Sequence, residues 1–252
     1  MTIKEYLDNP MGKGDSSIIN RKILQESMTE KFYKYINKKG KLIKMRSYVT
    51  AGGEYYIHLV LPSETDRDNT YDIAFHFYDP DKKFVSSKSV REYQVQMFSN
   101  DPSFAYTFAY VYHENGLMVP GLEDRLGKDF VTKKPVVRNS HQIVNYEKYL
   151  FFGAKYLLEN NFLTRVYLTT HATTFLQVAF VRSIRTLSTI MTEYHKAERQ
   201  LTKEKKYAKA QETKEKARKE PKGRKEPAVR KIEKLPKKKG TRSHQVNKIR
   251  KK

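Results

Sequence analysis

The chain has 252 residues and a mass of 29.7 kDa, enough for one medium-sized domain with an extension or for two small domains. It carries 50 Lys and Arg against 28 Asp and Glu, and residues 196–252 hold 24 of these cations but seven of the acids. The basic character therefore belongs to the C-terminal part. The absence of cysteine excludes disulfides, thiolate metal sites and a cysteine nucleophile, and it fits a reducing cytoplasm.

The apolar stretches are too short, or too interrupted by charge, to cross a membrane or to serve as a signal peptide. Lys155 and Arg182 break the two most apolar segments, and the N-terminal MTIKEYLDN has no apolar core. The sequence therefore predicts a soluble protein that makes no membrane contact.

The first half of the chain predicts a helix followed by an antiparallel meander. A helical stripe of Leu24, Met28, Phe32 and Tyr35 ends near Lys39-Gly40. Alternating runs then predict strands at 41–49, 54–62 and 71–79, with a fourth favoured over a helix at 90–98. The third run places Tyr71, Ile73, Phe75 and Phe77 on one face and Asp72, Ala74, His76 and Tyr78 on the other, as in a half-buried strand.

The second half predicts helices. Asp101 and Pro102 begin one that Asn115-Gly116 ends, and residues 117–139 follow as a long irregular connection, typical of a contact surface. Two more apolar stripes each predict an amphipathic helix. Their members are Ile143, Tyr146, Leu150, Ala154 and Leu157 for the first, and Leu176, Phe180, Leu187, Ile190 and Tyr194 for the second.

The last predicted helix changes character beyond Lys196, where strong helix formers continue without an apolar stripe. After Glu220 the composition cannot bury enough apolar area to offset the ordering entropy, so we expect disorder. The predicted fold is therefore α+β: an N-terminal helix, a three- to four-stranded antiparallel meander, and a helical second half with a long C-terminal helix and a disordered basic tail. The predicted domains are 1–195, compact, and 196–252, a charged helix and tail.

The most motif-like segment is NPMGKGDSS, residues 9–17. A phosphate-binding Walker A loop needs G-x-x-x-x-G-K-[ST] between a buried strand and a helix. Here Gly12-Lys13 is followed by Gly14, and no Gly lies five residues before Gly12. The segment is better interpreted as a mobile arm whose Asp15 or Ser16 caps the first helix. Binding of one phosphate or carboxylate near Lys13 stays open.

Two constellations in the strands suggest metal chemistry. His58, Asp72 and His76 share one face if their strands pair, and two imidazoles with a carboxylate can bind a divalent metal. Histidine also alternates with tyrosine on exposed strand faces, and that interpretation is favoured. Asp72 with Glu92 resembles the acids of metal-dependent nucleases, but Gln94 stands where those enzymes have lysine.

The basic C-terminal part carries the strongest physical signal. Its lysines and arginines can neutralise phosphates and release counterions, which gives salt-dependent binding without base specificity. Solubilising, ribosomal or anionic-membrane roles are alternatives, although the segment has one aromatic residue and no apolar face. The residues expected to contact nucleic acid are Lys203, Lys205, Lys206, Lys209, Arg218, Lys237, Lys238 and Lys239.

The chain also has 18 Tyr and 13 Phe. The segment 104–112 would place aromatic side chains all round one helix, which favours packing in a protein assembly and predicts a homo-oligomer.

Three segments resemble proteins encoded by tailed bacteriophages of Gram-positive hosts: NPMGKG with Asn20-Arg21, FSNDPSFAYTFAYV at 98–111, and VRNSHQIVNYEKYLFFGAKYL at 137–157. The resemblance covers most of residues 9–160 and implies a virion-associated protein assembled in the host cytoplasm, with other virion proteins as partners. It supplies no catalytic residue. We therefore expect a non-enzymatic virion structural or nucleoprotein component, with no cofactor and no metal. The alternatives are a metal-dependent, nuclease-like enzyme and a replication or transcription accessory factor.

Overall fold

The computed structural model describes residues 1–8, 18–65, 69–81, 89–135, 139, 144 and 146–219. These residues divide into two compact units, Met1–Glu204 and the described part of Lys205–Lys252. The predicted boundary between residues 195 and 196 is thus close to the division of the structure, which falls within one long helix. Residues 9–17, with the NPMGKGDSS segment, and residues 220–252, with the expected disordered tail, lie outside the described residues.

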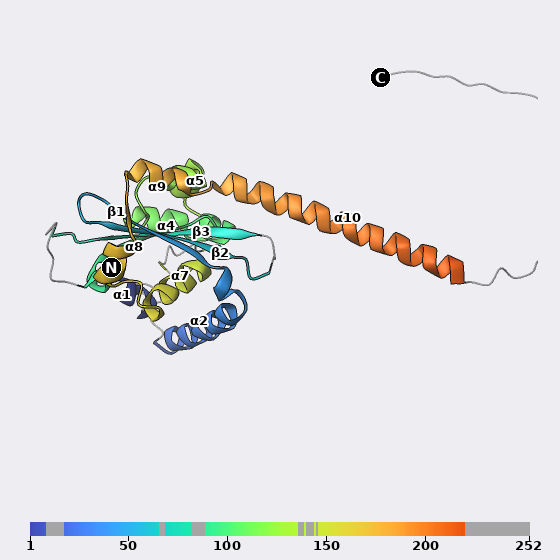
Figure 1. Cartoon of the computed structure of the whole chain (residues 1–252), viewed down its shortest axis with the longest axis horizontal. Coiled ribbons are helices and arrows are strands. Elements are labelled where there is room, and N and C mark those ends of the chain that lie inside the picture. The colour runs from blue at the N-terminus through green and yellow to red at the C-terminus, as the bar shows by residue number, and fades with distance from the viewer. Residues whose placement is uncertain are drawn as a thin grey trace, which may run out of the picture. The chain divides into compact units, whose positions relative to one another are not determined.

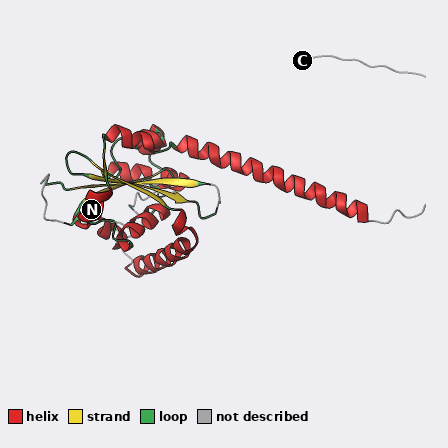
Figure 2. Ribbon diagram, in the orientation of Figure 1, coloured by secondary structure: helices red, strands yellow, loops and turns green. Residues whose placement is uncertain are grey.

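The body is a mixed α+β fold around one sheet (Figures 1 and 2). The strand order is β4-β3-β2-β1-β5, in which β1 to β4 form the predicted antiparallel meander and β5 pairs parallel to β1. The strands are β1 (Lys44–Val49), β2 (Tyr55–Pro62), β3 (Thr70–Tyr78), β4 (Gln94–Ser99) and β5 (Thr173–Thr174).

Helices cover both faces of the sheet. Before β1 come α1 (Ile3–Asp8) and α2 (Ile18–Lys39), and two single turns are η1 (Gly40–Leu42) and η2 (Val90–Glu92). After β4 come α3 (Pro102–Thr107), α4 (Ala109–Glu114), α5 (Glu123–Leu126), α6 (Lys128–Thr132), α7 (Lys148–Glu159), α8 (Arg165–His171), α9 (Gln177–Ser183) and α10 (Leu187–Lys219). In Figure 1, α7 and α2 lie on one side of the sheet and α4, α5 and α9 on the other.

The first face of the sheet packs against α7, with α2 behind it. A glycine at position 153 makes this close approach possible, because a Cβ there would stand 3.0 Å from a ring carbon of Phe75 and 3.1 Å from a methyl carbon of Leu59. Phe32 and Tyr35 of α2 contact the ring of Phe152 in α7, so the predicted stripe of α2 does form its buried side.

The second face packs against α3 and α9. The ring of Phe98 lies 6.2 Å from that of Phe104, and the ring of Tyr56 lies 5.0 Å from that of Phe180. Because helices cover both faces of the sheet, both sets of side chains of β3 are buried. Asp72, Ala74 and His76 on one face are as inaccessible as the apolar residues on the other. The prediction of a half-buried strand was therefore wrong.

Three further expectations from the sequence need correction. The connection 117–139 contains α5 and α6, and its Val119 and Leu122 are fully buried in the core instead of forming an outer contact surface. The aromatic segment 104–112 forms two consecutive short helices that meet at Phe108. The rings of Phe104 and Tyr112 are buried, and Tyr106 is about half exposed.

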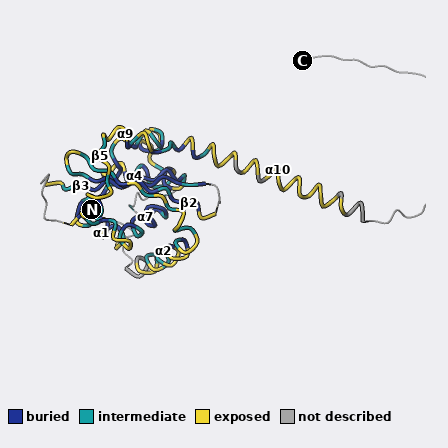
Figure 3. The backbone as a smooth tube through the Cα atoms, in the orientation of Figure 1, coloured by how far each residue is buried: buried dark blue, intermediate teal, exposed yellow. Residues whose placement is uncertain are grey.

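The third correction concerns the predicted helix from Leu176 to Tyr194. It divides into α9 and α10 because Ile184 adopts an extended conformation and Thr186 accepts a hydrogen bond from the Thr189 amide at 3.2 Å, which caps a new helix. The charged helix expected beyond Lys196 is present, since α10 runs to Lys219 (Figure 3). No helix among the described residues is both long enough and apolar enough to cross a membrane.

Candidate functional site

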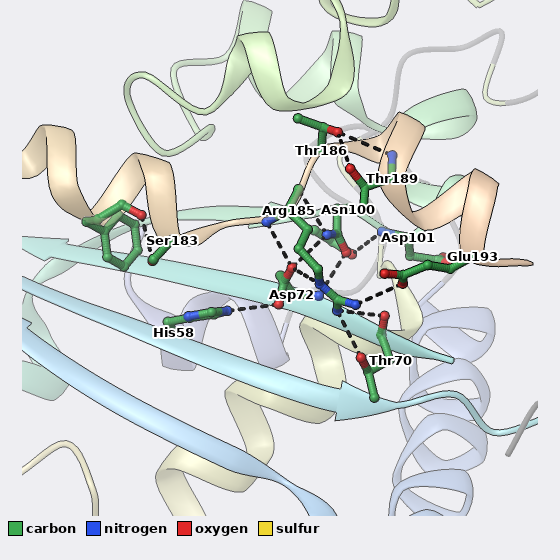
Figure 4. A network of polar contacts seen from close by, with 12 residues as sticks. His58, Thr70, Asp72, Asn100, Asp101, Ser183, Arg185, Thr186, Thr189 and Glu193 are labelled. Carbon is green, nitrogen blue, oxygen red and sulfur yellow. Dashed lines mark hydrogen bonds and ion pairs between the residues drawn. The ribbon is translucent and has the colours of Figure 1, made fainter. Parts of the chain in front are cut away.

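A buried polar network on the second face of the sheet centres on Asp72 of β3 (Figure 4). One carboxylate oxygen, Oδ1, lies 3.0 Å from Nε2 of His58. The other, Oδ2, accepts from Nε of Arg185 at 2.8 Å, from the Arg185 main-chain N–H at 3.1 Å and from Nδ2 of Asn100 at 3.0 Å. All the acceptor capacity of this carboxylate is directed at groups of the protein itself.

Arg185 links the sheet to the start of α10. It lies in the three-residue connection between α9 and α10, and its Nη2 donates to the main-chain oxygen and the hydroxyl of Thr70, each at 2.9 Å. Its Nη1 donates to Glu193 in the first turns of α10 at 3.1 Å. The guanidinium therefore fixes the first turns of α10 to the start of β3 (Figure 4).

The electrostatics of this network follow from burial and charge. Burial raises the pKa of Asp72, but hydrogen bonds and charge from His58 and Arg185 outweigh that effect and hold the pKa below its ordinary value. Asp72 is thus an ionised carboxylate neutralised by an arginine whose side chain is 29% exposed. This arrangement stabilises the fold and engages both carboxylate oxygens with groups of the protein.

The three residues considered as metal ligands do share one sheet face, as the register of β2 and β3 requires. They do not converge, because His76 turns to Gln96 at 2.8 Å and Glu54 at 3.1 Å and stacks on the ring of Tyr56. Within the described part of the chain, no group of three His, Asp or Glu residues is arranged to hold a metal ion. The favoured interpretation, histidines on an exposed strand face, was wrong, because His58 and His76 are both buried.

The nuclease-like pair is also separated. Asp72 lies just outside the pair formed by Ile73 and Ser99, whereas Glu92 precedes β4 beyond the pair formed by Tyr78 and Gln94. At about 3.3 Å per residue, this places the two carboxylates roughly 20 Å apart along the sheet. Glu92 is exposed in η2. One metal ion cannot bridge these two acids.

A second polar cluster surrounds a cavity of about 320 Å³, lined in part by Asp101, Glu147 and Lys148. Glu147 caps α7 by accepting from the amides of Tyr149 at 3.0 Å and Leu150 at 2.7 Å, and it shares a hydrogen bond with Asp101, which precedes α3. Burial raises the pKa of both carboxyls, that of Glu147 to about 8, and their mutual repulsion adds to the effect on Glu147. Burial therefore favours the protonated form of both carboxyls.

The predicted nucleic-acid contacts lie on α10 where the structure describes them. Lys203, Lys205, Lys206 and Lys209 are exposed on this helix, and the backbone of Arg218 belongs to its last turn. Lys237, Lys238 and Lys239 lie outside the described residues.

Sequence reasoning missed Arg185, Asn100 and Glu147. Arg185 stands between two buried apolar residues, Ile184 and Leu187, and an arginine in that setting signals a buried partner. Glu147 stands directly before an apolar helix, where a carboxylate is a candidate N-cap. The first signal does not identify Asp72, and the second identifies the neighbouring amides of α7 but not Asp101, since Asp72 and Asp101 lie far away in the sequence.

No protein family model, no curated protein and no solved structure matches this chain. The class that the observations define is an α+β body with helices on both faces of its sheet and a long basic C-terminal helix. The resemblance to phage virion proteins stays a prediction.

Proposed function

We propose that this protein is a non-enzymatic nucleic-acid-binding component, in which the body makes protein–protein contacts and the basic C-terminal segment binds nucleic acid without sequence specificity. The observation that carries the proposal is α10, which begins in the core at Leu187 and continues as a helix whose described side chains beyond Thr192 are exposed. Its segment from residue 196 onward carries the chain's large excess of cations.

The setting that we propose is a bacteriophage virion, on the strength of the resemblance in residues 9–160. The protein would assemble in the host cytoplasm, associate with copies of itself and with other virion proteins, and enter the particle with the genome. A replication or transcription accessory factor would use the same physical contact with a different partner.

Nuclease-like activity is the weaker alternative, and the geometry of Asp72 argues against it. Arg185, Asn100 and His58 occupy its oxygens, and Glu92 is far along the sheet. Magnesium-dependent cleavage that disappears in Asp72→Asn, assayed at a temperature at which circular dichroism shows the variant to be folded, would reverse this judgement.

Filter binding to duplex DNA and to single-stranded RNA at low salt tests the main proposal. The full chain is compared with a chain that ends at Tyr194, which keeps the buried Leu187 and Ile190. We expect the shorter chain to lose most of its affinity. Equal affinity of the two chains would refute a role for the C-terminal segment.

A further inference from the structure

The rotational setting of α10 is fixed where the helix leaves the core. Leu187 and Ile190 are 4% and 2% exposed, so one side of the first turns faces the body. The Arg185 network and the Thr186 cap hold the same turns in position. At about 100° per residue, these contacts determine which later side chains of the body's part of α10 face outward.

The outward side of this part of the helix is basic. Lys196, Arg199 and Lys203 are exposed and follow one another at spacings of three and four residues, so they form a stripe. Each is at least roughly 100° around the helix from both Leu187 and Ile190.

The acids of this segment are kept off the stripe. Glu198 and Glu204 are exposed, and each lies roughly 120° around the helix from the middle of the stripe. Lys205 and Lys209 are also exposed, and they stand two and six residues beyond Lys203, which are not the spacings of one helix face. Charges scattered for solubility alone would not need this separation.

We infer that Lys196, Arg199 and Lys203 form the surface of α10 that lies along the phosphate backbone of a nucleic acid. The inference rests on the proposed function and goes further, because it assigns the contact to one face of the helix. Within 196–219 the sequence has Leu201 and Tyr207 as its only large apolar residues. A membrane-surface helix needs a broad apolar face, so charge complementarity favours a polyphosphate.

This arrangement has a structural consequence. Neighbouring cations of the stripe stand three or four residues apart, and like charges at these spacings destabilise a free helix. Binding to phosphates removes that repulsion. The helical signal in far-ultraviolet circular dichroism should therefore increase when duplex DNA is added. It should not increase when sodium chloride is added at the same concentration of negative charge.

Two matched double variants of the full chain test the inference. Lys196→Gln with Lys203→Gln removes two cations from the stripe, whereas Lys205→Gln with Lys209→Gln removes two from outside it, with the same change of charge and residue type. The dissociation constant for a random-sequence DNA duplex is measured as a function of salt concentration. The slope of log affinity against log salt should fall by about 1.8 for the stripe variant and by less than half of that for the control.

The outcomes are distinguishable. Equal losses in the two double variants would overturn the stripe while leaving nucleic-acid binding by the segment intact. Equal binding by the full chain and by the chain that ends at Tyr194 would instead overturn the proposed function. Phosphatidylserine-containing vesicles and poly-glutamate serve as competitors, and competition by either at the same charge concentration as DNA would overturn the choice of a nucleic acid as partner.

Discussion

The ion pair between Arg185 and Asp72 is the contact whose loss has the clearest expected effect. Arg185→Met keeps the aliphatic stem of the side chain and removes the guanidinium. Asp72, whose side chain is 3% exposed, then loses its bond of 2.8 Å to Nε, while the bonds from His58, Asn100 and the main-chain amide of residue 185 remain. Thr70 and Glu193 also lose their guanidinium contacts.

The magnitude follows from this geometry. Breaking a buried ion pair by removing one partner typically costs about 3–5 kcal/mol, and an exposed pair contributes at most about 1 kcal/mol. Because the Arg185 side chain is 29% exposed and Asp72 keeps three donors, we expect a loss of about 2–3 kcal/mol in the free energy of unfolding. Asp72→Asn and the double variant complete a cycle, with an expected coupling energy of about 1–3 kcal/mol.

Urea unfolding at pH 7 measures these values, and the pH dependence supplies an internal check. The pKa of Asp72 is lowered in the folded protein, so its stabilising effect is present above the ordinary pKa of aspartate and is lost as the pH falls through the lowered value. The difference between wild type and Arg185→Met should therefore shrink in acid. A loss below about 0.5 kcal/mol at pH 7, or one that does not change on acidification, would refute the assignment of Arg185 as the anchor of α10.

Two other predictions concern the core. The raised carboxyl pKa values let the folded state hold extra protons between about pH 5 and 8. The free energy of unfolding therefore falls as the pH rises, by about 1.4 kcal/mol per pH unit for each extra proton. Asp101→Asn should make this fall smaller. Urea unfolding at pH 5.5 and pH 8 should show the variant gaining on wild type at the higher pH, and parallel pH profiles would show that the pKa of Asp101 is not raised beside Glu147. Gly153→Ala should destabilise by about 1–3 kcal/mol in thermal unfolding, since its methyl group would press on Phe75 and Leu59. An unchanged melting temperature would show that α7 can move away from the sheet.

Much of the fold could be predicted because its elements are periodic in sequence. The buried side of α2 is predicted by the apolar stripe of Met28, Phe32 and Tyr35, and that of β2 by the alternation in 54–62. The short connections between the strands predict the antiparallel meander. The fourth strand at 94–99 and the end of α2 at Lys39 were also predicted correctly.

The candidate site could not be predicted for a physical reason. In the sequence, Asp72 and His76 occupy positions typical of the solvent-facing side of a strand. They can be buried because side chains from distant segments pair with their hydrogen-bonding groups. Arg185 is 113 residues from Asp72 in sequence, and polar periodicity does not specify such pairings. The break between α9 and α10 was missed for the same reason, since Arg185 fits the polar side of a continuous helix as well as it fits a buried ion pair.

The outer edge of β4 has a consequence for how copies of the protein can meet. The amides of Val95 and Met97, which an incoming strand would use as donors, already bond to the main-chain oxygens of Met1 at 2.9 Å and Leu117 at 2.7 Å. At the opposite edge, β5 pairs with β1 at two positions, Tyr48 with Thr173 and Val49 with Thr174. Exposed strand edges are the usual starting points for domain swapping and fibril growth. At the β4 edge, the contacts of Val95 and Met97 therefore block an incoming strand, so copies of the protein cannot extend the sheet through these two amides.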